Sequence, residues 1–221
     1  WVDGAGNEQW TWNPSAGFLP VPPVPGAIGS FAYGLSGDGA ALVGQALIGT
    51  TWHPVRWRAG IPALLSLPPD ADACRVSRAS QDGAIAFGAC EGPDFVMPVR
   101  WDEQGVALDL GRLDDGSRAI ERWEIDAGGR TAFALSRRPG DGYRGVVRWT
   151  EASGYERLHP PNASYETEIL SLSADGRRAL LRRIETGTSL SLRSLWDPVY
   201  GLRDLWTELV EVYGLDLSRT V

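Results

Sequence analysis

Ser80-Gln81-Asp82-Gly83, followed eighteen residues later by Trp101 and then by Gly105, is one copy of a pattern that recurs along the chain. Each copy lies between two short apolar runs, and its aspartate and glycine favour the tight turn of a β-hairpin. The pattern therefore predicts one β-hairpin in each of four repeats. The other copies are Ser36-Gly37-Asp38-Gly39, Asp126-Ala127-Gly128-Gly129 and Ser173-Ala174-Asp175-Gly176, and the final glycines are spaced 44, 46 and 47 residues apart.

Five tryptophans recur in phase with these turns, each followed within five residues by a glycine and an apolar residue. They are Trp12, Trp57, Trp101, Trp149 and Trp196, at spacings of 45, 44, 48 and 47 residues. A fixed period of this length is typical of repeat proteins, in which each unit buries its apolar face against its neighbours. The order strand, Asp-Gly turn, strand, tryptophan strand, glycine turn and final strand matches one four-stranded blade of a β-propeller.

The predicted fold is therefore all-β: a propeller of about five blades of four antiparallel strands, either incomplete or a fragment of a larger propeller. We expect one propeller-like domain over residues 1–221, with no linker that divides it. The expected parts are a partial blade at 1–26, blades at about 27–69, 70–113, 114–160 and 161–206, and a tail at 207–221.

The tail carries a different periodicity. Apolar residues from Leu205 to Tyr213 recur at helical spacing, after Asp204 as a candidate N-cap and before Gly214 as a C-terminal stop. This pattern predicts one short amphipathic helix near 204–213. Residues 210–221 either complete the first blade or lead into a further repeat.

Two pentapeptides show a family resemblance: His53-Pro54-Val55-Arg56-Trp57 and Met97-Pro98-Val99-Arg100-Trp101, each after an Asp-Gly hairpin. The chain resembles bacterial extracellular HAF-repeat proteins, whose repeat carries His-Ala-Phe before its tryptophan. Here Pro54 and Val55 replace the alanine and phenylalanine, and one copy keeps the histidine. The resemblance implies a secreted or envelope-associated protein, extracellular, on the cell surface or periplasmic, of largely unassigned activity.

The two cysteines give independent evidence on the compartment. Cys74 and Cys90 lie eight residues on either side of Asp82, so an antiparallel hairpin centred on that turn places them opposite each other. This register favours a disulfide over two buried free thiols. A disulfide in turn indicates an oxidising compartment.

Composition excludes several chemistries. The chain has no lysine, so a Schiff base or a P-loop lysine is impossible, and its two histidines and two cysteines make a zinc site of the usual type a poor fit. A net charge of −7 disfavours nucleic acid as a partner. No apolar run has the length of a membrane span. We expect no cofactor and no metal, and the sequence leaves the oligomeric state open.

Carboxylates are abundant, but the recurring ones fall in the turns. We interpret Asp38 with Gly39, Asp82 with Gly83, and Asp175 with Gly176 as structural turn residues. The candidate ligand-binding residues are Trp52, in a loop before the tryptophan strand, and Trp123, Arg78 and Glu124, at first-strand positions expected to line a channel; packing is the competing interpretation for both tryptophans.

The preferred function is a binding or scaffold module for a glycan or a protein, without catalytic residues. One alternative is a carboxylate-dependent glycosidase or lyase on the same scaffold. Another is a purely structural surface repeat.

Overall fold

The computed structural model describes residues 9–93, 95–111, 118–137, 144–158, 165–185, 188 and 190–216. Within these residues the chain forms eighteen β-strands and one short helical segment. The chain divides into two compact units, Trp1–Gly111 with Ala127–Gly129, and Arg112–Asp126 with Arg130–Val221. The prediction of one domain over the whole chain stays a prediction.

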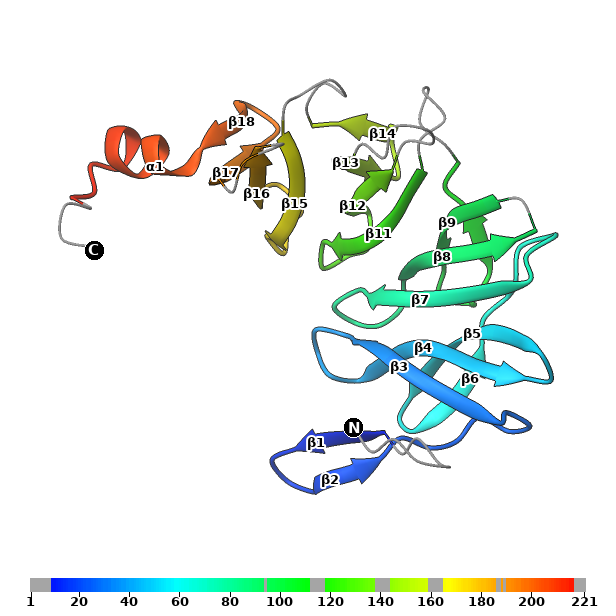
Figure 1. The fold of residues 1–221 in the computed structure, drawn as a ribbon. Helices are drawn as coiled ribbons and strands as arrows, with labels where there is room; N and C mark the ends of the chain where they lie inside the picture. The colour runs from blue at the N-terminus through cyan, green and yellow to red at the C-terminus, as the bar shows by residue number, and fades with distance from the viewer. Residues whose placement is uncertain are drawn as a thin grey trace. The chain divides into compact units, whose positions relative to one another are not determined.

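The first unit contains a two-stranded hairpin and two four-stranded antiparallel blades (Figure 1). A single parallel pair, Trp52 with Ala73, joins the two blades. The hairpin is β1 (Trp10–Asn13) and β2 (Gly17–Pro20); the blades are β3 (Gly29–Leu35), β4 (Ala41–Ile48), β5 (Thr51–Arg58) and β6 (Ile61–Leu64), then β7 (Ala73–Ala79), β8 (Ala86–Gly92), β9 (Phe95–Trp101) and β10 (Ala107–Asp109).

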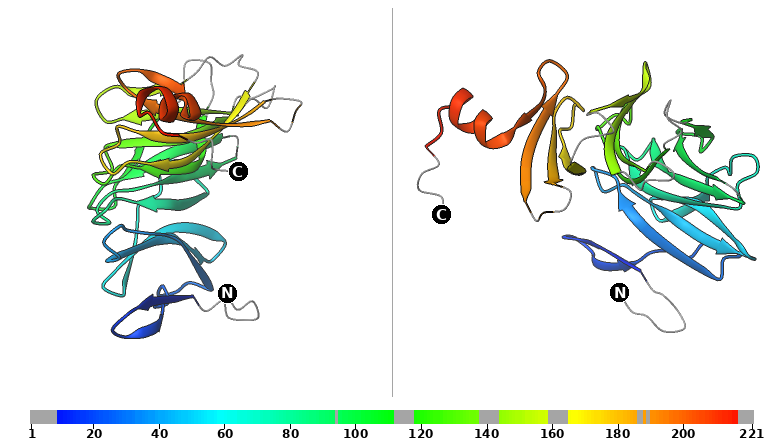
Figure 2. Two further views of the ribbon diagram at one scale, coloured as in Figure 1. Left: turned by 90° about the vertical axis from the view of Figure 1, so that its left-hand side faces the viewer. Right: turned by 45° about the horizontal axis from the view of Figure 1, so that its top comes forward.

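The second unit contains two further blades, each again pairing its strands in chain order (Figure 2). A helical segment follows the last strand. The strands are β11 (Arg118–Ile125), β12 (Thr131–Arg137), β13 (Arg144–Thr150) and β14 (Gly154–Arg157), then β15 (Tyr165–Leu172), β16 (Ala179–Glu185), β17 (Ser191–Asp197) and β18 (Gly201–Asp204).

Three of the four hairpin turns share one set of hydrogen bonds. Asp82 accepts from the Ser80 hydroxyl at 2.6 Å and from the Ala84 amide at 2.9 Å. Asp38 and Asp175 make the same contacts in their own turns. The serine hydrogen bond, and after it the backbone amide, lower the pKa of all three carboxyls, since these contacts stabilise the ionised form.

The turn glycines also set how closely successive blades pack. A Cβ on Gly83 would lie 2.3 Å from the Cβ of Ala41, and one on Gly176 would lie 2.9 Å from the Cβ of Thr131. Ala41 and Thr131 each begin the second strand of the preceding blade. The turns are linked as well, because the Asp38 amide donates to the Gln81 carbonyl at 2.9 Å. Glycine is therefore required twice here, for its positive φ and for this close approach.

The first strand of each blade carries a β-bulge six residues before the turn glycine. Pairing skips one residue at Tyr33 in β3, at Ser77 in β7 and at Leu170 in β15. In β11, Arg122 and Trp123 together stand against one residue of β12. Because a bulge re-aims side chains locally, it decides what each blade presents at this position.

The repeat tryptophans of the four complete blades are buried in the blade cores. The Trp57 indole donates to the Pro22 carbonyl at 2.9 Å, and the Trp101 indole donates to the Ser66 carbonyl at 2.8 Å. Each indole is thus hydrogen-bonded to the chain segment that leads into its own blade. In the second unit, Phe133 meets Trp196 edge to face, with ring centroids 5.2 Å apart.

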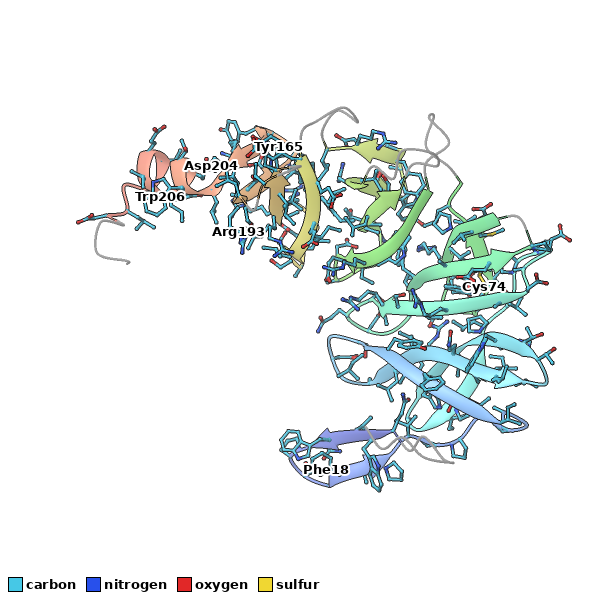
Figure 3. All side chains as sticks on the ribbon, viewed as in Figure 1. Phe18, Cys74, Tyr165, Arg193, Asp204 and Trp206 are labelled. Atoms are coloured by element: carbon cyan, nitrogen blue, oxygen red, sulfur yellow. A yellow bond between two sulfur atoms is a disulfide. The ribbon has the colours of Figure 1, made fainter. Side chains whose placement is uncertain are left out.

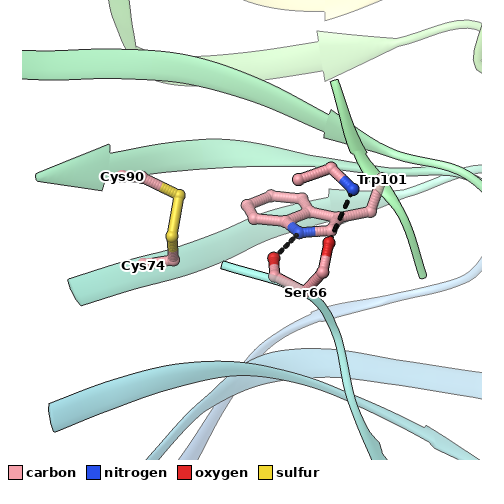
Figure 4. The surroundings of a disulfide bond; sticks show 5 residues. Ser66, Cys74, Cys90 and Trp101 are labelled. Carbon is pink, nitrogen blue, oxygen red and sulfur yellow. Dashed lines mark hydrogen bonds between the residues drawn. A yellow bond between two sulfur atoms is a disulfide. The ribbon is translucent and has the colours of Figure 1, made fainter. Parts of the chain in front are cut away.

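Cys74 and Cys90 form a disulfide, as the hairpin register predicts (Figure 4). They are paired residues of β7 and β8, with Cα atoms 4.0 Å apart. Both are buried in the core that also contains Trp101. The bond clamps the first two strands of this blade.

The predicted helix is present, although its burial differs from the expected pattern. It runs through α1 (Leu205–Thr207) and the following turn Glu208–Val212, and the Asp204 carboxylate caps it by accepting from the Thr207 amide at 3.0 Å. Glu208 is buried because it receives a hydrogen bond from Arg203 at 2.6 Å, whereas Trp206 is exposed (Figure 3). None of the helical segments in the described residues has the length and hydropathy of a membrane span.

Candidate functional site

Three aromatic side chains gather on one face of the first blade. The Phe31 and Trp52 rings lie 5.6 Å apart between centroids and are tilted, and the Phe31 and Tyr33 rings stack at 6.3 Å. Phe31 pairs with Gln45 across β3 and β4, and Trp52 follows on the same face of β5. We call Phe31, Tyr33 and Trp52 the aromatic cluster.

A cation and two polar groups border the aromatic cluster. The Arg75 guanidinium lies 5.9 Å from the centroid of the Tyr33 ring, and Gln45 stands opposite Phe31 on the neighbouring strand. Burial raises the pKa of Tyr33, and Arg75 and Gln45 offset only part of that rise. The phenol therefore stays neutral at physiological pH and remains both a donor and an acceptor.

Two local features of β3 build this arrangement. Tyr33 is the bulged residue, and its side chain is 40% exposed. Gly34 follows it, and a Cβ there would meet the Ser77 carbonyl oxygen at 2.8 Å. Because Gly34 lacks that atom, β7 packs directly against β3, which brings Arg75 to the Tyr33 ring.

The four residues that the sequence singled out for ligand binding fall in different places. Trp52 belongs to the aromatic cluster, at the start of β5 rather than in a loop, and is half-buried. Arg78 lies on β7 and donates to the Ser77 carbonyl at 3.1 Å. Trp123 and Glu124 lie on β11 in the second unit. Trp123 is only 1% exposed.

Sequence reasoning missed most of the aromatic cluster. The sequence singled out only Trp52 from this group, and not Phe31, Tyr33, Gln45 or Arg75. The available signal was the alternation of Phe31 and Tyr33 on one strand. The approach of β7 to β3 depends on Gly34, and no sequence motif indicates it.

The acidic and histidine side chains of the described residues bear on the alternative of a glycosidase or lyase. No group of three or more histidine, cysteine, aspartate or glutamate side chains there is arranged to hold a metal ion. The described carboxyls whose pKa is shifted are all shifted downward. A glycosidase needs one carboxyl with a raised pKa as its general acid. His53 lies on β5, and the second histidine, His159, lies outside the described residues.

No family model matches the chain, and no curated protein matches it in sequence. Solved structures match in fold. A protein described as a TolB from Agrobacterium tumefaciens shares 16% identity over 92% of this chain and 74% of that chain, with a TM-score of 0.62.

Two other solved structures are also similar. TolB from Acinetobacter baumannii has 14% identity over 86% of this chain and 46% of its own, with a TM-score of 0.56. Oligogalacturonate lyase from Vibrio parahaemolyticus has 9% identity over 90% of this chain and 59% of its own, with a TM-score of 0.59. At these identities the likeness concerns the fold, and it confirms the predicted class: an all-β protein of the β-propeller kind.

Proposed function

We propose that this chain is a recognition module that binds carbohydrate at the aromatic cluster. The observation that carries the proposal is the combination of the Phe31, Tyr33 and Trp52 rings on the first blade with the Arg75 guanidinium of the second blade. Ligand sites combine apolar and aromatic surface with a few convergent polar groups. Aromatic faces pack against the C–H face of a pyranose ring, and the Tyr33 hydroxyl and Gln45 amide supply hydrogen bonds to sugar hydroxyls.

Arg75 selects among carbohydrates. It is exposed and lies beside Tyr33, where a guanidinium can hold a carboxylate with two parallel hydrogen bonds. We therefore propose acidic oligosaccharides, built from uronic acids, as the preferred ligand class. Oligogalacturonates, the substrate named for one structural neighbour, combine such carboxylates with pyranose rings and serve as a probe.

Binding without catalysis is the function that these groups support best. The turn carboxyls Asp38, Asp82 and Asp175 are ionised and engaged by serine hydroxyls and backbone amides, so they do not supply a general acid. A protein ligand and a purely structural role remain as outcomes of the experiment below.

We also propose that the chain works in an oxidising compartment, as an extracellular, surface or periplasmic protein of the HAF-repeat type. Its support is the buried Cys74–Cys90 disulfide together with the repeat pattern. Mass spectrometry of the native protein under non-reducing, alkylating conditions tests this. Two alkylated thiols would refute the oxidising location.

The binding proposal is tested by titration calorimetry with neutral and uronate oligosaccharides. Trp52→Ala is expected to weaken binding of both classes by about tenfold or more, as loss of an aromatic contact does. Arg75→Gln, at an exposed position, is expected to weaken only the acidic class. Trp10→Ala, at an exposed tryptophan outside the aromatic cluster, is the control and should leave both unchanged. If folded protein binds no oligosaccharide, the proposal is wrong and a protein ligand or structural role takes its place.

A further inference from the structure

The first unit contains a groove of about 1110 Å³ between the β1–β2 hairpin and the first blade. Trp12, Leu35, Gly39 and Leu42 are among the residues that line it, with Arg58, Asp38 and Asp82 among its polar residues. The groove is distinct from the aromatic cluster, none of whose rings line it. Comparison with the complete blades of the same chain indicates what fits there.

Trp12 is the repeat tryptophan of the β1–β2 hairpin, and its environment differs from that of its counterparts. Its side chain is 63% exposed, whereas those of Trp57, Trp101, Trp149 and Trp196 are at most 6% exposed. In each complete blade the tryptophan pairs with a small or aliphatic residue of the second strand, namely Leu42, Ala86, Ala132 and Ala179. Within the described residues, β1 pairs only with β2. No described residue therefore pairs with the edge of β1 that would receive a second strand.

On the side of the groove opposite Trp12, residues of the first blade are likewise exposed. A Cβ on Gly83 or on Gly176 would collide with the preceding blade, but a Cβ on Gly39 would have no neighbour within 4 Å. Leu35, immediately before the same turn, is 56% exposed, whereas its counterpart Ala79 is 8% exposed. The first blade thus presents the surface that the other blades bury against a preceding hairpin.

We infer that this groove is a docking site for a β-hairpin of the chain's own repeat type. The occupant consists of a strand, an Asp-Gly turn and a second strand that adds to the edge of β1, by the same backbone pairing as in the complete blades. Its second strand places a small residue opposite Trp12, and the residue before that one lies against Gly39. This arrangement continues the blade-to-blade interface already present between the first and second blades.

The chain supplies a suitable probe. A synthetic peptide of residues 71–93 contains the β7–β8 hairpin, with Ala86 as the small residue and Ile85 before it. Its Cys74–Cys90 disulfide closes the hairpin in register. Closure reduces the ordering that binding requires, so the oxidised peptide is expected to bind more tightly than the same peptide reduced and alkylated.

The experiment measures binding of the immobilised peptide to the whole chain by biolayer interferometry. Trp12→Ala and Leu35→Arg change residues that are exposed in the free protein, and each is expected to weaken binding about tenfold or more. Trp52→Ala, in the aromatic cluster, is the control and should leave peptide binding unchanged. The peptide with Ala86→Glu should bind at least about tenfold more weakly, since it places a charge opposite Trp12.

Three results would overturn the inference: no binding of the oxidised peptide to folded protein, unchanged binding by both groove variants, or equal affinity of the closed and open peptides. Because the aromatic cluster and the groove are tested by different variants, failure here is separate from failure of carbohydrate binding.

Discussion

Arg56 is the residue whose removal tests the packing of successive blades most sharply. Its side chain is only 4% exposed on β5, and its guanidinium donates to the Gly83 carbonyl at 3.2 Å, to Ala84 at 2.7 Å and to Asp102 at 2.8 Å. The pKa of Arg56 is lowered, mainly by burial and secondarily by the neighbouring Arg58, but the guanidinium remains charged. It joins the first blade to two loops of the second.

Arg56→Ala leaves three carbonyl acceptors without this donor. Each buried acceptor that loses its partner costs about 1–3 kcal/mol, and relief of the guanidinium's own desolvation offsets part of the sum. We expect a net loss of about 3 kcal/mol. For a chain of this length, that corresponds to a fall in Tm of about 6–12 °C.

The matched control is Arg58→Ala, two residues along the same strand. Arg58 is exposed and makes one hydrogen bond, at 3.3 Å, to the Asp82 carbonyl, so its loss should cost about 0.5 kcal/mol or less. Hydrogen exchange at residues 83–85 gives a local measurement that does not depend on both units unfolding together. Equal stability and equal exchange for Arg56→Ala and the wild-type protein would refute the reasoning.

Three further changes have defined outcomes. The double variant of Cys74→Ala and Cys90→Ala should lower the free energy of unfolding, measured by chemical denaturation, by about 3 kcal/mol, the value for a disulfide that closes a loop of this size. No loss of stability would contradict a stabilising role for this disulfide. Trp123→Ala should cost about 3–5 kcal/mol because the ring is buried, and a thermal melt that matches the wild-type melt would place the ring at the surface instead. The folded-state pKa of Asp82 is lowered, so the stability that this carboxyl contributes is present above its unfolded pKa of about 3.9 and is lost as pH falls through the folded value. Asp82→Asn should therefore make stability fall less steeply below about pH 4. An unchanged dependence of stability on acid pH would contradict this expectation.

Much of the fold could be predicted because its signals are local and repeated. The Asp-Gly turns, the phase of the tryptophans and the symmetry of Cys74 and Cys90 about Asp82 each report a short-range geometry, and four-stranded blades, turns and the disulfide are all present. The helix cap at Asp204 was predictable for the same reason. Its burial was not, because Glu208 is drawn inward by Arg203, a partner on β18.

The candidate site was less predictable because bulges and strand approach decide it. Tyr33 and Trp123 occupy equivalent bulge positions, yet one is 40% exposed and the other is buried. Residue type alone does not predict this difference in exposure, since both are aromatic residues on first strands. The difference for Tyr33 depends on Gly34 and on Arg75 from the adjacent blade, contacts that span some forty residues of sequence.

The most direct test of the proposed carbohydrate site is a titration of protein labelled with nitrogen-15 in its tryptophan side chains, followed by NMR. The indole signal of Trp52, assigned with Trp52→Phe, should shift progressively as an acidic oligosaccharide is added, while the signals of the buried Trp57 and Trp101 stay in place. A saturable shift of Trp52 would place the ligand on the aromatic cluster. Shifts confined to Trp10 and Trp12, or no shift in any indole, would contradict the assignment.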